Sequence, residues 1–381
     1  MKKIPYGRQH IDKKDIAHVV KSLKGELITT GIFVKKFEKD LKYFFKSKFA
    51  LTCNSGTSAI HMAFKGIDVK TNDIIIMPAV NFIASYNVAK ILNAKVYLAD
   101  IDELSGQMTP EKVDDCIKKN GLKKIKAILT MYMGGYPENI IEFNKLKKRL
   151  SCYIIEDACH ALGAKYRLKT KNYMVGSCKH SDISTFSLHP LKTITSGEGG
   201  VATTNKKYLY DNMARYRSHG IIRDKKKHWL YDVKETGQNY RLSDINCALG
   251  ISQLKKITRF ISHRKKIFNV YKNKLKKYHN VIKFFKYKKS NSPSFHLFLI
   301  SINFEKIGKS KNRFMKYMFD NNIICQYHYM PIYKFKIYGN KNFYYKNTEY
   351  YFKNTISLPI YFNLKTKEQS YIIKKIEAFL N

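Results

Sequence analysis

The sequence predicts an α/β protein whose main domain is a largely parallel β-sheet covered by helices on both faces. Apolar runs of strand length alternate with segments of helical periodicity between residues 49 and 217. Parallel neighbours are joined by long crossovers that are usually helices, so this alternation indicates β-α units. In such sheets ligands bind at the carboxyl ends of the strands. A small-residue turn at Gly56, the carboxylate Asp157 and the loop of Lys192 all follow expected strands.

The elements of this domain follow from the chain in order. Helical spacing predicts helices over residues 12–24 and 33–45, the first of which ends at Gly25. The expected strands are residues 49–53, 74–78, 95–98, 125–129, 152–157, 182–186 and 201–204. The expected helices between them are residues 59–65, 82–92, 110–119, 140–150 and 206–217.

The pattern changes in the second half of the chain. Residues 220–237 are charged and irregular, and Ser243 begins a predicted helix that runs to about residue 256. Further helical spacing reaches about residue 278, and the remainder predicts strands at 295–302 and 323–328 and helices at 310–320 and 366–380. We therefore predict a large domain of residues 1–250 and a small α/β domain of residues 251–381.

The composition narrows the class of protein. No apolar stretch of the 381-residue chain approaches the roughly 20 residues of a membrane helix, and the N-terminus lacks the apolar centre of a signal peptide. We therefore expect a cytoplasmic protein. The 7 cysteines, an odd number without a C-x-x-C pair, indicate reduced thiols rather than a disulfide framework or a zinc site. We expect no metal.

The formal net charge of +42 is the most unusual feature of the composition. The lysines are spread along the chain and accompanied by many Asn, Ile and Tyr, as an adenine- and thymine-rich coding sequence would produce. We therefore interpret the charge as drift at surface positions and expect no nucleic-acid partner, although anionic substrates would be attracted. A basic nucleic-acid-binding protein is the alternative.

One lysine is distinguished by its context. Lys192 follows Pro190 in a loop after an expected strand, because proline stops regular structure and so presents this lysine from a loop. Asp157 ends the preceding buried strand. A carboxylate and then a lysine at neighbouring strand ends suit a pyridoxal phosphate site. There the lysine forms the Schiff base and the carboxylate keeps the pyridine nitrogen protonated.

The turn at residues 54–58, Asn-Ser-Gly-Thr-Ser, lies between an expected strand and an expected helix. Free backbone N–H groups and the positive end of the helix dipole make such a turn a suitable phosphate seat. The alternative is a simple N-cap, in which Ser or Thr precedes a helix.

Four segments in the same order carry a family resemblance: residues 54–59, 156–163, 187–200 and 237–244. Together they resemble the DegT/DnrJ/StrS family of pyridoxal-phosphate-dependent nucleotide-sugar aminotransferases over nearly the whole chain. The resemblance implies aminotransferase fold type I, with a large domain built on a mostly parallel seven-stranded sheet and a small C-terminal α/β domain. It also implies a transamination in which L-glutamate is the expected donor.

Within that family, further segments resemble the enzymes that aminate C4 of a UDP-linked 4-keto-6-deoxy-N-acetylhexosamine on the way to pseudaminic acid. These segments are residues 4–9, 175–178, 189–190 and 326–331. Amination at C3, or at C4 of a different nucleotide ketosugar, is the alternative. Met133 to Pro137 and Leu188 depart from the family's usual residues and could alter the sugar pocket.

The resemblance assigns roles to particular residues. Lys192 and Asp157 would be the catalytic pair. The cofactor-binding residues would be Gly56, Thr57 and Ser187 at the phosphate, Phe82 stacked on the ring, His160 near the ring hydroxyl, and Asn239. Asn239 would contact the cofactor phosphate of the neighbouring subunit, so a homodimer with shared sites is expected. Tyr6, Arg223, His328 and Tyr329 would contact the substrate.

Two other functions share this fold. A related dehydratase uses a histidine in place of the Schiff-base lysine, and Lys192 argues against it. A regulator without catalysis could also have kept the fold, and only a test for the bound cofactor separates it from an enzyme.

Overall fold

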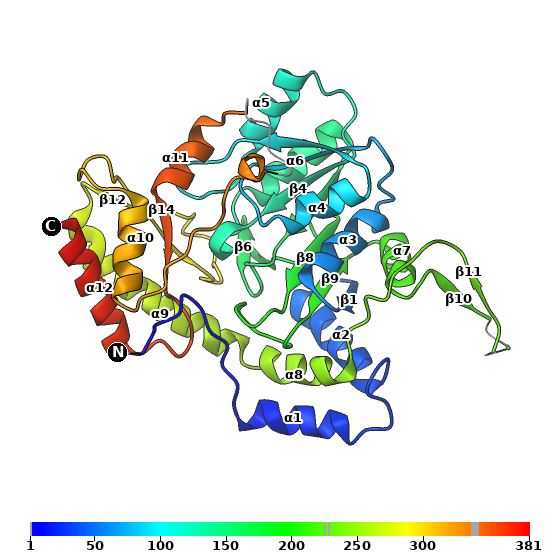
Figure 1. The fold of residues 1–381 in the computed structure, drawn as a ribbon. Helices are drawn as coiled ribbons and strands as arrows, with labels where there is room; N and C mark the ends of the chain where they lie inside the picture. The colour runs from blue at the N-terminus through cyan, green and yellow to red at the C-terminus, as the bar shows by residue number, and fades with distance from the viewer. Residues whose placement is uncertain (1, 225, 228, 337–342) are drawn as a thin grey trace.

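The computed structural model describes residues 2–224, 226–227, 229–336 and 343–381. Its centre is a seven-stranded sheet in the order β1-β9-β8-β5-β4-β2-β3 (Figure 1). The strands are β1 (Phe49–Cys53), β2 (Ile74–Pro78), β3 (Lys95–Ala99), β4 (Ala127–Met131), β5 (Tyr153–Asp157), β8 (Ile183–Ser187) and β9 (Gly200–Thr204). Neighbours from β3 to β8 are parallel, whereas β9 runs antiparallel to both β8 and β1. The predicted mostly parallel sheet is confirmed.

Helices cover both faces of the sheet. One face carries α3 (Gly56–Gly66), α4 (Ala84–Ile91) and α7 (Lys207–Arg217). The other carries α2 (Ile32–Phe45), α5 (Pro110–Asn120), α6 (Ile140–Leu150) and α8 (Asp244–Leu254). Successive residues of a strand point to opposite faces, so Ile155 belongs to the first core and Ile154 to the second. This is why the strands read as continuous apolar runs.

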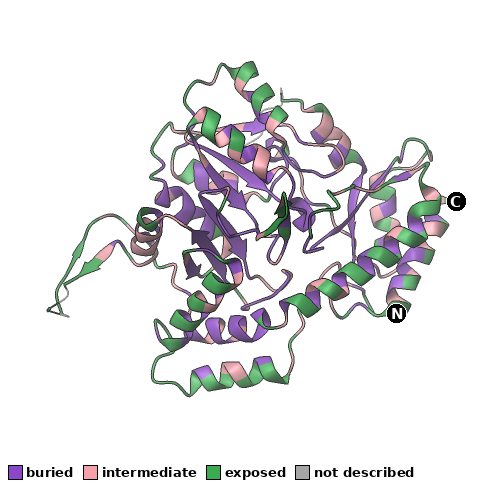
Figure 2. Ribbon diagram, turned by 180° about the vertical axis from the view of Figure 1, so that it is seen from behind, coloured by how far each residue is buried: buried purple, intermediate pink, exposed green. Residues whose placement is uncertain are grey.

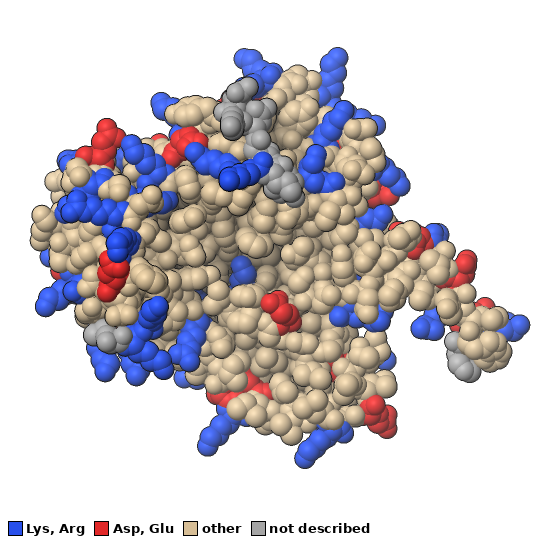
Figure 3. Space-filling model, in the orientation of Figure 1, with Lys and Arg blue, Asp and Glu red and all other residues tan. Residues whose placement is uncertain are grey.

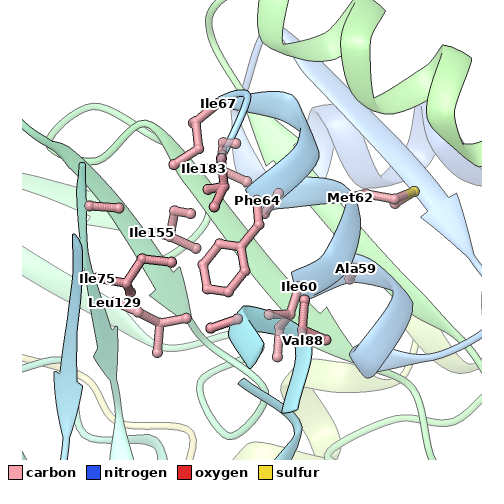
Figure 4. Packing of buried hydrophobic residues seen from close by; sticks show 14 of the residues in the cluster. Ala59, Ile60, Met62, Phe64, Ile67, Ile75, Val88, Leu129, Ile155 and Ile183 are labelled. Atoms are coloured by element: carbon pink, nitrogen blue, oxygen red, sulfur yellow. The ribbon is translucent and has the colours of Figure 1, made fainter. Parts of the chain in front are cut away.

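Phe64 of α3 is fully buried at the centre of the first core. Its ring lies among side chains of three adjacent strands, including Ile75, Leu129 and Ile155 (Figure 4). Burial of an aromatic side chain of this size removes a large apolar area from water. The packing fixes α3 against the sheet and therefore fixes where the helix begins.

The C-terminal part of the chain forms a second unit beside the sheet (Figure 1). It contains α9 (Ile257–Leu275), β12 (Ile282–Lys283), β13 (Phe298–Ile302), α10 (Lys311–Asp320), α11 (Lys346–Asn354), β14 (Thr355–Leu358) and α12 (Thr366–Leu380). The three strands form an antiparallel sheet in the order β12-β13-β14. The division into residues 1–250 and 251–381 stays a proposal.

The N-terminal segment belongs spatially to this C-terminal unit. Ile4 is buried in its apolar core and exchanges backbone hydrogen bonds with Asn322 and Ile324, at 2.8 and 2.9 Å. The chain then crosses to α1 (Lys13–Leu23), whose N-cap is Asp12 and which packs on α8. The first residues therefore connect the two units.

An aspartate from α8 caps the start of α2. Gly31 is the N-cap of α2, and it has no side chain that could accept hydrogen bonds from the first backbone N–H groups of the helix. The buried Asp244 carboxylate accepts instead, from the N–H of Gly31 at 2.7 Å, of Phe33 at 2.8 Å and of Val34 at 3.4 Å. A negative charge at a helix N-terminus is also favoured by the helix dipole.

Some elements differ from the sequence-based prediction. Residues 220–237, expected to be irregular, contain a hairpin of β10 (Ile221–Arg223) and β11 (Tyr231–Val233) that extends away from the body (Figure 1). A second hairpin, β6 (Lys165–Leu168) and β7 (Lys171–Met174), was not predicted. The prediction of a strand at residues 323–328 is wrong, because that segment makes only single-residue bridges at Ile323 and Gln326.

Positively charged side chains outnumber negative ones on the surface and are not gathered in one patch on the face shown in Figure 3. Lys and Arg side chains are spread around the face shown in Figure 3, while the area around its central hollow carries few charges. Burial follows the layers, since the sheet is buried and the outer helix faces and the hairpin are exposed (Figure 2). Among the described residues, no helix is long and apolar enough to cross a membrane.

Candidate active site

A pocket of about 280 Å³ lies at the carboxyl ends of β4, β5 and β8, between the large sheet and the C-terminal unit. This is the edge at which the alternation of strands and helices predicted a ligand. The structure brings together there most of the predicted site residues: Lys192, Asp157, Gly56, Thr57, Phe82, His160, Ser187, Tyr6, His328 and Tyr329.

One end of the pocket is the start of α3. Ser55 caps the helix by accepting the N–H of Ser58 at 3.1 Å, so the turn is an N-cap. The same turn lines the pocket, and its role as a phosphate seat stays a prediction. A methyl group on Gly56 would lie 2.8 Å from Cβ of Ser187. Only glycine therefore allows these two segments to approach this closely. The first N–H groups of a helix have no intrahelical acceptor and suit an anion.

Asp157 is buried where β5 ends. Its carboxylate accepts the N–H of Cys159 at 3.2 Å and the hydroxyl of Ser85, on α4, at 3.4 Å. These two donors come from different elements, and together they fix the direction of the carboxylate. The pocket therefore contains one oriented anionic group that a protonated ring nitrogen could pair with.

Lys192 lines the pocket from a loop that hydrogen bonds within the loop hold in place. The Lys192 N–H donates to the carbonyl of His189 at 2.9 Å, and the Thr195 hydroxyl donates to the carbonyl of Leu188 at 2.9 Å. Burial lowers the pKa of the Lys192 ammonium, while Cys159 and Asp157 act in the opposite direction. A lowered pKa increases the fraction of free amine, which is the nucleophilic form.

His160 and Tyr329 form a hydrogen-bonded pair in the pocket wall. His160 Nε2 lies 3.0 Å from the hydroxyl oxygen of Tyr329, and the N–H of Gly134 donates to His160 Nδ1 at 3.4 Å. Burial lowers the pKa of His160 well below the usual range, with further contributions from the charge of Lys192 and from two other histidines. His160 is therefore neutral.

Those two histidines are His296 and His328. The ring of His296 lies 4.3 Å from the ring of His160, centroid to centroid, and lines the same pocket. Burial and then Lys192 lower the pKa of His328 to about 3. The sequence did not single out His296, because it lies inside an expected strand and its neighbour His160 is remote in the chain.

Within the described ranges, no group of His, Cys, Asp or Glu is arranged to hold a metal ion.

Two aromatic side chains flank the pocket. Phe82 remains 52% exposed although it lines the pocket, and its ring lies 5.6 Å from that of Tyr329. A large apolar ring left exposed on a pocket wall is available for stacking on a bound planar group. Tyr6 packs edge to face on His328, at 5.6 Å between ring centroids.

Asn239 and Arg223 are the two predicted site residues that do not line this pocket. Asn239 is exposed, and its carbonyl accepts the side-chain amide of Asn54 at 3.5 Å. Arg223 is exposed on β10, in the hairpin that extends away from the body. Neither residue therefore contributes to the pocket of its own chain.

The donor set fits pyridoxal phosphate. A helix start with a close glycine approach suits the phosphate, a half-buried lysine suits the aldehyde, and an oriented carboxylate suits the ring nitrogen. All three lie in one pocket, with an exposed aromatic ring on its wall.

Comparison with known proteins also indicates an aminotransferase. Residues 9–377 match the DegT/DnrJ/EryC1/StrS aminotransferase family. A UDP-4-amino-4,6-dideoxy-N-acetyl-beta-L-altrosamine transaminase from Campylobacter jejuni is 36% identical over 97% of this chain and 95% of its own length. A GDP-perosamine synthase from Escherichia coli O157:H7 is 28% identical over 100% of this chain and 99% of its own length.

A solved structure is similar throughout. Helicobacter pylori PseC, described as an aminotransferase involved in the biosynthesis of pseudoaminic acid, superimposes with a TM-score of 0.90. It is 27% identical, and the match covers 100% of this chain and 99% of that protein. The seven-stranded sheet and the C-terminal unit are therefore arranged as in a sugar-pathway aminotransferase.

Proposed function

The chain belongs to the DegT/DnrJ/EryC1/StrS aminotransferase family, and from this premise we propose that it aminates C4 of a UDP-linked 4-keto-6-deoxy-N-acetylhexosamine. L-Glutamate is the donor and pyridoxal 5′-phosphate is the cofactor. The observation that carries the proposal is the convergence of Lys192, Asp157 and Gly56 in one pocket. The product serves the synthesis of a pseudaminic-acid-type surface sugar.

The bound cofactor supplies an electron sink and carries nitrogen from one substrate to the other. Lys192 would hold the cofactor through its side-chain nitrogen at rest. Once the donor's amine has displaced it, the free Lys192 amine would take the proton that leaves the donor's α-carbon and return a proton in the second half of the reaction. An amine whose pKa is lowered by burial suits this role, because it must accept and release a proton near neutral pH.

Asp157 would keep the ring nitrogen protonated by accepting a charge-assisted hydrogen bond from it. Two fixed donors, the Cys159 N–H and the Ser85 hydroxyl, already orient its carboxylate, so little reorganisation accompanies the reaction. Gly56, Thr57 and Ser187 line the pocket at the start of α3 and would bind the phosphate, and Phe82 would stack on the ring. Together these residues hold the reacting atoms in one orientation.

The identity of the sugar is inferred from names of relatives and from the pocket. The named transaminases from Campylobacter jejuni and Helicobacter pylori support a UDP-linked 4-keto sugar. Tyr6 and His328 line the side of the pocket formed by the C-terminal unit and the N-terminal segment, where a sugar could approach Lys192. The GDP-perosamine synthase relative makes another nucleotide ketosugar the alternative substrate.

We also propose a homodimer with shared sites. Asn239 and Arg223 lie outside the pocket of their own chain, as residues that serve a neighbouring subunit would. The hairpin around Arg223 exposes Ile222, Leu230 and Tyr231, which is unusual for a surface that stays in water. Arg223 would contact the diphosphate of the substrate, to which its planar guanidinium can bind bidentately. The cytoplasm stays the expected location.

The deciding experiment is NMR of the product formed from the UDP-linked 4-keto sugar and glutamate. An amine on C4 supports the proposal. Turnover of a dTDP-linked 3-keto sugar without turnover of the 4-keto sugar would assign a different substrate and leave the pocket assignments standing. Lys192→Ala should remove activity but keep the fold, because only the covalent and proton-moving group is lost.

A simpler measurement distinguishes the proposed enzyme from a regulator of the same fold. The purified enzyme should show visible absorbance from the lysine-bound cofactor, and borohydride should fix that cofactor to Lys192, as peptide mass spectrometry would report. A protein that neither absorbs nor becomes labelled at Lys192 would be a binder without this chemistry.

A further inference from the structure

His61 is a buried polar side chain to which the proposed chemistry gives no role. It stands on α3, the helix whose start lines the pocket, but does not line the pocket itself. Its Nδ1 lies 3.0 Å from the Tyr240 hydroxyl oxygen, and its Nε2 lies 3.0 Å from that of Tyr216. Burial lowers the pKa of His61 to about 4, so the ring is neutral. A neutral imidazole has one donor and one acceptor and can therefore bind both hydroxyls at once.

The two tyrosines belong to segments that run side by side. Tyr216 lies in the last turn of α7, and Tyr240 lies in the segment that leads to α8. The N–H of Gln238 donates to the carbonyl of Tyr216 at 2.8 Å, and the N–H of Tyr240 donates to the carbonyl of Arg217 at 3.0 Å. These two bonds bracket Asn239. His61 therefore joins the segment around Asn239 to α3 as well as to α7.

Asn239 is held through main-chain atoms. It is exposed, and its carbonyl accepts the side-chain amide of Asn54 at 3.5 Å. The next residue, Tyr240, is half-buried and packs against the core on the α3 face of the sheet. The N–H of Asn54 also donates to the carbonyl of Tyr240 at 2.9 Å. The direction in which Asn239 leaves the surface thus depends on how firmly Tyr240 is anchored.

We propose that His61 is a positioning residue for the site of the neighbouring subunit. Through the Tyr240 hydroxyl, it fixes the main chain that presents Asn239 to the cofactor phosphate of that subunit. The inference rests on the proposed function, because it requires pyridoxal phosphate and a shared site. Since the start of α3 would bind the phosphate of its own chain's site, His61 links the two phosphate seats of the dimer. The alternative is a histidine that only stabilises its own α3.

The test uses a hybrid dimer with one lysine able to hold the cofactor. One chain carries Lys192→Ala and supplies Asn239, while its partner carries Asn239→Ala and supplies Lys192. The chains bear different affinity tags, are refolded together, and the hybrid is purified through both tags. Pyridoxal phosphate is then titrated and fixed with borohydride, and peptide mass spectrometry measures the label on Lys192. This readout is cofactor binding at one defined site and does not depend on turnover.

Tyr240→Phe removes one hydroxyl and keeps the ring. In the chain that supplies Asn239, it should raise the cofactor concentration for half-labelling by about two- to tenfold, the effect of one lost hydrogen bond. In the chain that supplies Lys192, it should leave that concentration unchanged. The two hybrids contain the same three substitutions, so a general loss of stability would affect both equally. His61→Leu, placed in the same two ways, should show the same asymmetry.

Tyr216→Phe is the matched control, because it removes the hydroxyl on the other side of His61 and leaves the bond to Tyr240 in place. It should leave half-labelling unchanged in either chain. Tyr240→Phe that weakens labelling equally in both placements, only in the chain that supplies Lys192, or in neither, would overturn the inference.

Failure of the proposed function gives different results. A parent hybrid that labels no better than the Asn239→Ala homodimer would overturn the shared site, and the role of His61 with it. A wild-type protein that is not labelled at Lys192 would overturn the proposed cofactor chemistry. Normal labelling of the parent hybrid, with a loss confined to the chain that supplies Asn239, supports the role of His61.

Discussion

A neutral histidine in the pocket predicts a loss of stability in mild acid. His328 is 6% exposed, and its Nδ1 lies 2.7 Å from the Ser357 hydroxyl. Burial, with a contribution from Lys192, lowers its pKa from 6.5 to about 3 in the folded protein. Between these values the unfolded chain binds a proton that the folded chain does not.

The sign and size follow from this difference. A lowered histidine pKa contributes stability that is fully present above the unfolded pKa and is lost as the pH falls toward the folded pKa. At one pKa unit per 1.36 kcal/mol, this single group should cost about 2 kcal/mol of the free energy of unfolding at pH 5. Buried carboxyls such as Glu156, whose pKa is raised by burial, act in the opposite direction.

The assay therefore compares variants rather than absolute values. We expect His328→Gln to be less stable than the wild type at pH 7.5, and the gap in urea midpoint, converted through a constant m-value, to shrink by about 2 kcal/mol at pH 5. His279→Gln is the control, since His279 is exposed. A gap that is the same at both pH values would refute the assignment of His328 as a buried neutral group.

Further predictions concern other parts of the chain. Asp244→Ala should lower the free energy of unfolding by about 3 kcal/mol, because three N–H groups at the start of α2 lose a charged acceptor, and amide exchange there should accelerate. Gly56→Ala should fold but retain pyridoxal phosphate poorly in equilibrium dialysis, because the new methyl group meets Ser187. Inactive Lys192→Ala and Asn239→Ala chains should regain activity when refolded together, if the sites are shared; no recovery, with a monomer by light scattering, would contradict the homodimer. DNA binding should be weak, and its affinity should fall steeply with salt concentration. A tight, sequence-selective complex would contradict the interpretation of the positive charge as drift at surface positions.

The parts of the site that the sequence predicted share one physical reason. Parallel strands end at one edge of a sheet, so residues that follow successive strands converge there without further information. Gly56, Asp157 and Lys192 are all of this kind. Local patterns also define the strands and helices that carry them, because the sheet is buried on both faces and reads as apolar runs.

The missed features depend on contacts between distant segments. His296 approaches His160 only because the C-terminal unit packs on the edge of the sheet. The segment at residues 323–328 is as apolar as a strand, but it pairs at single residues with the N-terminal segment and β14. The β10–β11 hairpin has charged residues and few buried side chains, so neither periodicity nor composition distinguishes it from a loop.

The burial of Ile4 has a consequence for how the protein is made. Ile4 leaves the ribosome long before its backbone partners, Asn322 and Ile324, which are synthesised much later. Until then its side chain has no apolar surroundings, and the C-terminal core lacks one of its members. Vectorial synthesis can therefore complete the large sheet before release, but not this core. A nascent chain stalled before α10 should remain sensitive to protease at its N-terminal segment.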